Sequence, residues 1–129
     1  MATEWMNYYQ NAVGQWIPNQ PVALDYYYID MDLNPPGRAV RLHSSSVGGQ
    51  VVLVPHGASV ASYGDVEVYA RILFADNTFR YISAPLRTPV DVQNVQSLRL
   101  GVVLIVGAPG ATSVDYRAYF NANLVYEYL

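Results

Sequence analysis

Cysteine and lysine are both absent from this chain of 129 residues. Without cysteine there is no disulfide framework and no thiol nucleophile, so the redox compartment cannot be inferred. All seven basic residues are arginine, a side chain that makes planar, bidentate and stacking contacts and is enriched at interfaces where lysine is depleted. The preference for arginine fits an interface role, and it fits the compositional bias of a GC-rich genome equally well.

Charge is scarce as well, because charged residues make up 13% of the chain against roughly 25% in ordinary soluble domains. With 52% hydrophobic residues the chain is too apolar to be disordered, and its length indicates one domain. Such a composition leaves part of the surface apolar, which suggests that another subunit covers it. The net charge of −3 and the scattered arginines argue against nucleic acid as a partner, since phosphate binding requires a basic patch.

Long apolar runs are also missing. No stretch of about 18 consecutive apolar residues occurs, so we expect no transmembrane helix and no membrane partner. The first residues contain an acidic side chain and no basic one, which is unlike a signal peptide. We therefore expect neither a signal peptide nor a membrane anchor.

The clearest pattern that is present lies at residues 114–128. Every second residue from Val114 to Tyr128 is apolar or aromatic, and five of the seven between them are polar. This period of two indicates a strand with one face on a core and the other largely in water. At about 3.3 Å per residue the strand would be about 50 Å long, so we expect it to bend, to carry a bulge or to run past its sheet, with Asn121 and Asn123 as the weak points.

Further strand candidates are separated by turn signals. They are residues 22–33, 38–43, 51–54, 65–74, 78–82 and 98–106. Residues 44–46, three serines, are expected to form a loop, and 51–54 a strand buried on both faces. The pattern predicts an all-β fold, an antiparallel β-sandwich of jelly-roll or immunoglobulin-like topology, and does not choose between the two topologies.

The first twenty residues follow a different pattern. Apolar residues recur there at helical spacing: Trp5, Tyr9, Ala12, Val13, Trp16 and Ile17. Thr3 would cap such a helix and Pro18 would end it. We therefore expect residues 1–20 to form a short helix or arm, and residues 21–129 to form the sandwich domain. The helix would cover an open end of its own sandwich or dock on a neighbouring molecule.

Catalytic and metal-binding signals are weak. The histidines His43 and His56 are accompanied by no Gly-x-Ser-x-Gly elbow, and a zinc site requires three or four His, Cys or carboxylate ligands. A segment beginning at Asp30 resembles a calcium loop, but Pro35 and Arg41 stand where that loop needs glycine and glutamate. A small hydrolase would need a histidine in a pocket beside a carboxylate. We expect no catalytic residue, no metal, no cofactor and no enzymatic activity.

The twelve tyrosines are the main compositional anomaly. Tyrosine suits surfaces that are apolar and still form hydrogen bonds, as at a subunit interface or on a platform that stacks on sugar rings. The residues expected at an interface are Trp5, Tyr9, Trp16, Tyr27, Arg117 and Tyr119.

These features favour a non-enzymatic structural protein that acts through self-association and by docking on a larger assembly. By analogy of fold alone, that assembly would be a virus or phage particle, with this chain as a capsid or capsid-decorating (cement) subunit, trimeric, and located in the virion. The alternative is a carbohydrate-binding, lectin-like β-sandwich. An extracellular or cytoplasmic location is the alternative to the virion.

Overall fold

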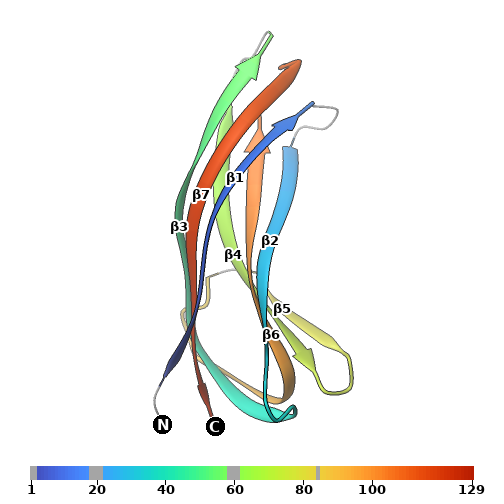
Figure 1. Ribbon diagram of the computed structural model, residues 1–129, viewed down its shortest axis with the longest axis vertical. Coiled ribbons are helices and arrows are strands. Elements are labelled where there is room, and N and C mark those ends of the chain that lie inside the picture. Colours follow the sequence, from blue (N-terminus) through green and yellow to red (C-terminus); the bar gives the residue numbers. More distant parts are fainter. Residues whose placement is uncertain (1–2, 18–21, 58–61, 84) are drawn as a thin grey trace.

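The computed structural model describes residues 3–17, 22–57, 62–83 and 85–129, and within these ranges all regular structure is β-strand (Figure 1). The strands are β1 (Glu4–Trp16), β2 (Val22–Asp32), β3 (Arg38–His56), β4 (Tyr63–Phe74), β5 (Phe79–Ile82), β6 (Val90–Gly107) and β7 (Ser113–Tyr128). Every pairing between them is antiparallel. The predicted fold class, an antiparallel β-sandwich, is confirmed.

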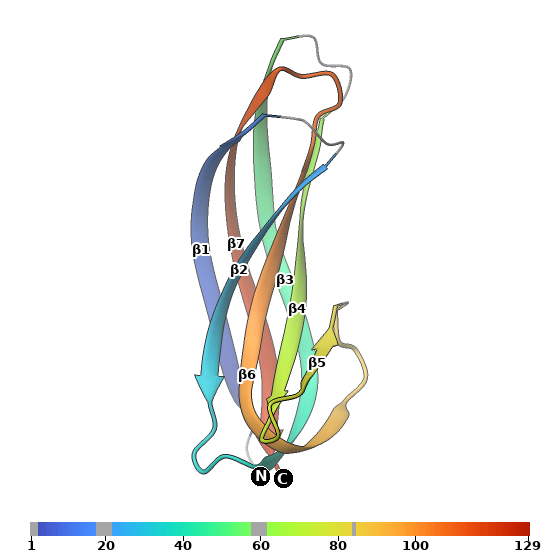
Figure 2. The same ribbon diagram turned by 90° about the vertical axis from the view of Figure 1, so that its right-hand side faces the viewer.

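The strands form two layers that are joined at one end. One layer has the order β1-β7-β3, and the other has β6 between β2 and β4, with β5 beyond β4. Residues 38–42 of β3 pair with residues 90–95 of β6, which connects the layers at the lower end in Figures 1 and 2. The long strands run along the long axis of the molecule, so each layer offers an extended outer face.

β7 is the central strand of the first layer, and its predicted alternation is confirmed. Its core-facing residues are buried, and Phe120 among them is completely enclosed. The ring of Phe120 lies 5.5 Å from that of Tyr8 and 5.7 Å from that of Tyr27. Burying a phenylalanine contributes about 2–3 kcal/mol, and these contacts tie β1, β7 and β2 together across the sandwich.

The length of β7 is accommodated by equally long neighbours. β1 pairs with it from Trp16 opposite Val114 to Glu4 opposite Tyr126, and β3 flanks its other edge throughout. The expected break at Asn121 and Asn123 is therefore wrong, and β7 has no overhang. The irregularity lies in β3 instead, where the register shifts between Leu42 and Ser44.

The helix expected within residues 1–20 is also wrong, because residues 4–16 form strand β1. Apolar residues four apart fit a helix of 3.6 residues per turn, and they fit a strand of period two equally well. Pairing with β7 decides between the two, since it buries Met6 and Ala12 on the core side. β1 is thus a structural strand of the first layer.

β3 departs from the sequence pattern as well. Residues 44–46 do not form a loop, because β3 runs without interruption from Arg38 to His56. Val52 and Val54 point outward and are about half exposed, so this part of the strand is covered on one face and not on both. The unbroken β3 gives β7 a partner along its full length.

Four glycines lie directly opposite an aromatic residue of the neighbouring strand. The pairs are Gly14–Tyr116, Gly49–Phe120, Gly101–Tyr69 and Gly107–Tyr63. At Gly14, Gly101 and Gly107, a tyrosine ring occupies the space that a β-carbon would need, and at Gly49 that space is taken by backbone atoms of Tyr119 and Phe120. Such pairing lets a large ring lie flat across a bare strand, as Tyr69 does at Gly101 on the outer face of the second layer.

Candidate functional site

The outer face of the layer β1-β7-β3 collects four of the six residues expected at an interface. Trp5 and Tyr9 point outward from β1, and Arg117 and Tyr119 point outward from the adjacent β7. In the ladder, Arg117 lies opposite Val13 of β1. The structure therefore brings these residues onto one continuous surface.

Trp16 and Tyr27, the other two expected residues, lie on the core side of their strands. Trp16 packs against the core from β1, and Tyr27 packs against Phe120 from β2. The hydroxyl of Tyr27 donates a hydrogen bond of 2.9 Å to Oδ2 of Asp25. Burial and this hydrogen bond raise the pKa of Tyr27 to about 12. Both side chains therefore pack in the interior of the sandwich and are not part of the outer surface.

Sequence reasoning missed two exposed residues next to Trp5 and Tyr9. The outward side chains of Trp5, Tyr9, Val13 and Ile17 are 66%, 61%, 76% and 70% exposed, and we call these four residues the β1 apolar row. The signal was present in the sequence, because all four occupy odd positions and so share one face of a strand. Four large apolar side chains in line, each mostly in water, form a feature typical of interaction surfaces.

β1 is also a free edge, since in the part of the chain that the structure describes it pairs with β7 alone. Edge strands are usually protected by charge, proline, short length or a covering loop. From Trp5 to Ile17 the chain has no charged residue and no proline. β1 therefore presents an unprotected edge from Trp5 to its end at Trp16.

Parts of the other edges carry such protection. β2, which lies beside β1 in Figure 2, has Asp25 directed inward and Asp30 directed outward. β5 is four residues long. On β3, the backbone N–H of Ser45 donates to the carbonyl of Leu86, and the N–H of Leu86 donates back to Oγ of Ser45, which covers part of that edge with the loop before β6.

A shallow hollow of about 400 Å³ adjoins the β1 apolar row. Its walls are Val13 from β1, Arg117 from β7, and Val52 and Val54 from β3. The hollow lets a side chain from another molecule seat between aliphatic groups beside one guanidinium. It extends the candidate surface across the whole width of the layer.

A second surface lies on the outer face of the other layer and is rich in tyrosine. A hollow of about 460 Å³ is lined by Tyr26, Tyr28, Glu67, Tyr69, Tyr81, Ser83, Arg99 and Val103. Tyr69 lies across Gly101 at its floor, with its ring 6.5 Å from that of Tyr26 and 6.4 Å from that of Tyr81. Burial raises the pKa of Tyr69. We call this hollow the tyrosine cleft.

Arg99 holds one side of the tyrosine cleft in place. Its guanidinium lies 3.6 Å from the ring centre of Tyr28 and donates from Nε and Nη2 to both carboxylate oxygens of Asp30, at 2.7 and 3.0 Å. The hydrogen bonds from Arg99 lower the pKa of Asp30. This carboxylate, which begins the calcium-like segment, is thus occupied by an arginine.

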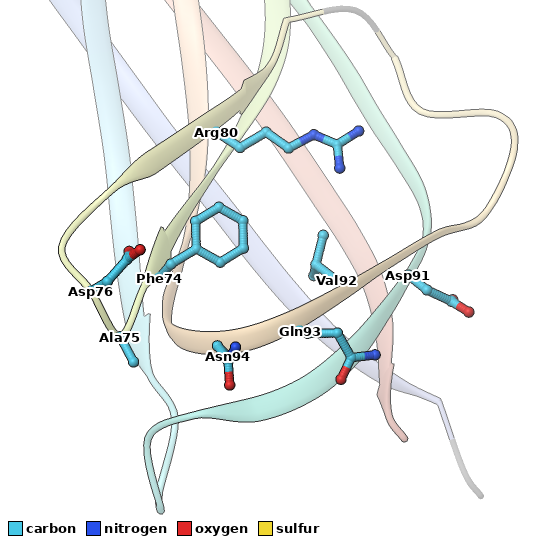
Figure 3. A pocket seen from close by; sticks show the side chains of 8 residues that line it. All are labelled: Phe74, Ala75, Asp76, Arg80, Asp91, Val92, Gln93 and Asn94. Carbon is cyan, nitrogen blue, oxygen red and sulfur yellow. The ribbon is translucent and has the colours of Figure 1, made fainter.

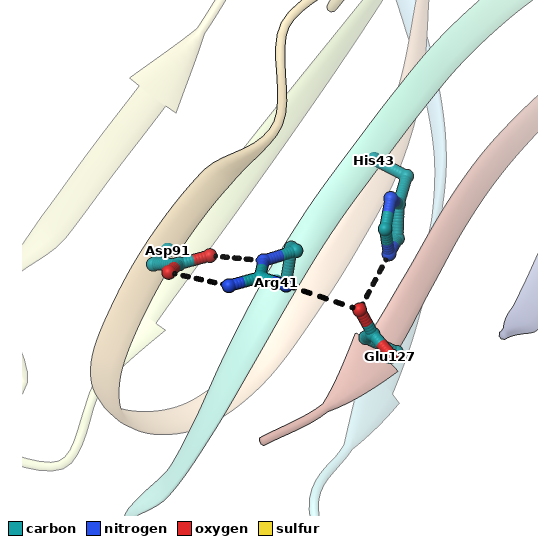
Figure 4. Close-up of polar contacts among 4 residues, drawn as sticks. All are labelled: Arg41, His43, Asp91 and Glu127. Carbon is teal, nitrogen blue, oxygen red and sulfur yellow. Dashed lines mark hydrogen bonds and ion pairs between the residues drawn. The ribbon is translucent and has the colours of Figure 1, made fainter. Parts of the chain in front are cut away.

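Both histidines lie beside carboxylates. Figure 4 shows Nε2 of His43 at 2.9 Å from Oε1 of Glu127, which also faces Arg41 at 3.5 Å. Arg41 binds Asp91 with two hydrogen bonds of 2.7 and 3.1 Å, which lower the pKa of that carboxyl. His56 forms a contact of 2.8 Å with Asp115 in the same way.

These histidine pairs lack the other parts of a hydrolytic site. Within the described ranges, no serine or threonine hydroxyl forms a hydrogen bond with the ring of His43 or His56. In the part of the chain that the structure describes, neither histidine lines any of the five main hollows. The described residues also contain no group of three metal-ligating side chains, so the geometry provides neither a nucleophile with its base nor a ligand set.

The largest hollow, about 680 Å³, lies at the lower end between the β4–β5 turn and the start of β6 (Figure 3). Phe74 and Val92 contribute apolar walls, and Arg80 extends over it. Its two carboxylates are already engaged, since Asp76 accepts a hydrogen bond of 2.6 Å from the Thr78 hydroxyl and Asp91 binds Arg41.

No family model matches the chain, and no curated protein matches it. Two solved structures share a weak likeness in fold. The chain is covered completely by a chain of the Gx strain of infectious bursal disease virus, at a TM-score of 0.34 and 8% identity, and spans 42% of that chain. For a VP2 subviral particle of the same virus, the TM-score is 0.30 and the identity 12%, over 98% of this chain and 41% of that chain.

TM-scores this low carry no argument about function, and this chain spans less than half of either matched chain. The described residues contain no helix that is long and apolar enough to cross a membrane. Any functional conclusion therefore rests on the surfaces of this chain itself.

Proposed function

We propose that the protein is a non-enzymatic structural subunit that self-associates and docks on a larger assembly. The observation that supports this proposal is the β1 apolar row on an unprotected sheet edge. Exposed tryptophan and tyrosine are frequent anchors of protein interfaces, and a free edge offers backbone groups that another strand can pair with.

The low charge of the chain supports the same conclusion. A surface with few charged residues, and with a row of apolar groups on one edge, is poorly adapted to remain uncovered in water. Covering the row would remove these side chains from water, at roughly 25 cal/mol for each Å² of apolar area. Assembly would therefore be driven mainly by the hydrophobic effect.

The larger assembly that we propose is a virus or phage particle, to which the chain would contribute a capsid or capsid-decorating subunit. This part of the proposal keeps the analogy of architecture drawn from the sequence. Under this proposal the protein is located in the virion, and a trimer is one candidate for its oligomeric state.

The proposal is tested by the molar mass in solution, measured by light scattering on a sizing column. The unmodified chain is expected to form oligomers, and V13K, which places a charge in the middle of the β1 apolar row, is expected to shift the mass to that of the monomer. L24K is the matched control, because Leu24 is also exposed (53%) but lies on the protected edge strand β2. A monomer at every concentration that also fails to co-sediment with virus or phage particles would overturn the proposal.

Carbohydrate binding is the second candidate function, and the tyrosine cleft is the observation that favours it. Tyr26 and Tyr81 present exposed rings on which a sugar ring could stack, and Glu67 and Arg99 offer polar partners at the same hollow. In a glycan screen, Y81A is expected to abolish binding and Y9A, at an equally exposed tyrosine of the other layer, to leave it unchanged. A flat result across a broad set of glycans would exclude this function.

A further inference from the structure

The outward side of β1 has an alternation of its own. Every second outward residue is large and apolar, and every residue between them carries an amide side chain. In order, the outward residues are Trp5, Asn7, Tyr9, Asn11, Val13 and Gln15 of β1, followed by the exposed Ile17 just beyond the end of the strand. The pattern therefore repeats every four residues along the free edge of the layer.

An edge strand that pairs with a second copy of itself in antiparallel fashion obeys two constraints. The pairing is symmetric, so one residue of β1 lies opposite the same residue of the second copy, and the twofold axis passes between the two. The pleat also requires outward residues to face outward residues, because a slip by one residue would turn the apolar side chains of one copy to the opposite face. These constraints leave a series of allowed registers, and from one register to the next the residue on the axis moves by one position along β1.

In one of these registers, all seven outward residues face a residue of the same type, with apolar residues opposite apolar residues and amides opposite amides. With Asn11 on the axis, Trp5 lies opposite Ile17 of the second copy, and Tyr9 lies opposite Val13. The amides match as well, because Asn7 then lies opposite Gln15 and Asn11 lies opposite Asn11. The next allowed register, with Gln10 on the axis, would place Trp5, Tyr9 and Val13 opposite amides and Ile17 opposite Thr3.

Centring the axis on Tyr9 or on Val13 also pairs apolar with apolar residues, but each of these registers leaves one end of the β1 apolar row without a counterpart. The register centred on Asn11 uses the whole row and all three amides. Directly opposed apolar pairs in a sheet contribute roughly 0.2–1 kcal/mol each, so this register is the most stable of the set.

We infer that β1 is a self-pairing edge, which joins two copies through an antiparallel β1–β1 contact with Asn11 on the twofold axis. This inference rests on the proposed function and specifies the surface that it uses. The contact joins the first layers of two molecules into one sheet with the order β3-β7-β1-β1-β7-β3. An isologous contact closes after two copies, so it predicts a dimer in place of the trimer considered above.

Charge does not oppose this contact. No charged side chain lies on β1 between Trp5 and Ile17, so no like charges meet across the axis. The closest outward charges of the layer are Asp115 and Arg117 on β7, opposite Gln15 and Val13. They flank the paired edges one strand away and remain open to water.

The absence of cysteine from the chain makes the register directly measurable. Paired residues in antiparallel strands have Cα atoms about 4.5–5.5 Å apart, which is within the range of a disulfide. N11C is therefore expected to form a covalent dimer under mild oxidation. N7C is the matched control, because its two copies would lie about 26 Å apart along the strand and should remain uncrosslinked.

A second pair of variants tests the same register away from the axis. Q15C alone is expected to remain uncrosslinked, whereas the double variant N7C/Q15C is expected to form a covalent dimer, since each cysteine would face its counterpart. Cross-linking of N7C alone as readily as N11C would overturn the register. All three positions are exposed outward sites, so circular dichroism is expected to show unchanged folding.

The outcomes also separate this inference from the proposal on which it rests. An oligomer in light scattering whose N11C form does not cross-link would overturn the β1–β1 contact and leave self-association intact. A chain that is monomeric throughout would overturn the contact, and one that also fails to co-sediment with virus or phage particles would overturn both. A dimer whose N11C form cross-links while N7C does not would establish the contact and its register.

Discussion

Gly49 of β3 lies directly opposite Phe120 of β7, and the core side of Gly49 has no room for a side chain. A β-carbon at this position would meet the carbonyl oxygen of Tyr119 and would lie 2.9 Å from Cα of Phe120. These obstacles are backbone atoms, so a change of side-chain rotamer cannot remove them. The close approach of the two strands at the most buried aromatic residue therefore depends on this glycine.

Replacement of Gly49 by alanine is expected to lower the free energy of unfolding by about 2 kcal/mol, because β3 must move away from β7. Gly48 is the matched control. A β-carbon on Gly48 would have no atom within 4 Å, so G48A is expected to be neutral or to stabilise by up to about 1 kcal/mol. Urea denaturation of both variants tests this, and equal midpoints would contradict the packing described at Gly49.

Stability is expected to fall in alkaline solution because of two core tyrosines. Burial, aided by neighbouring groups, raises the pKa of Tyr27 and of Tyr126 from 10.0 to about 12. Between these values the unfolded chain has released protons that the folded chain retains. The contribution to stability is therefore complete below pH 10 and is lost as the pH rises towards 12.

The measurement is the urea midpoint as a function of pH, together with the ultraviolet absorbance of tyrosinate. The double variant Y27F/Y126F is expected to lose less stability between pH 10 and pH 12 than the unmodified chain, since two of the titrating hydroxyls are gone. Y9F, at an exposed tyrosine, should leave the decline unchanged. Identical pH profiles for all three proteins would show that these two residues do not cause it.

Arg99 is expected to tolerate lysine poorly, although the charge is kept. Lysine cannot reproduce the two parallel hydrogen bonds to Asp30 or stack flat on the ring of Tyr28. We expect R99K to lower the free energy of unfolding by ~1 kcal/mol. R41K is the control, because Arg41 also binds its partner Asp91 with two hydrogen bonds but lies in a more exposed pair.

The two variants are compared by thermal unfolding. R41K is expected to lower the stability clearly less than R99K does, because exposed ion pairs contribute little. A loss at R41K as large as that at R99K would indicate that burial and stacking add nothing to the Arg99 pair.

Removal of β1 is expected to prevent cooperative folding. A chain that starts at Val22 would lack Met6 and Ala12 from the core, and Phe120 would lose its contact with Tyr8. Calorimetry should show no sharp unfolding transition for this chain. W5S, which changes an exposed residue of the same strand, is expected to keep the transition, and a truncated chain with an unchanged transition would mean that β1 is dispensable for the core.

The sequence determined the fold class, because a strand with one face on the core and one face in water has apolar and polar residues in alternation. The alternation at residues 114–128 therefore predicted β7, and the Asp76–Asn77 turn with its flanking runs predicted the β4–β5 hairpin. It also identified Trp5, Tyr9, Arg117 and Tyr119 as interface candidates, and the tertiary structure places these four on one face.

What the sequence left ambiguous was decided by pairing between distant segments. The spacing of Trp5, Tyr9, Val13 and Ile17 is compatible with a helix and with a strand, and only the ladder with β7, more than one hundred residues away in the chain, makes it a strand. The same ladder turns Trp16 inward. A local pattern shows the period at which apolar residues recur in a segment. It does not show which strand the segment pairs with, because that choice depends on contacts with distant residues. The pairing in turn determines which face of the strand remains exposed.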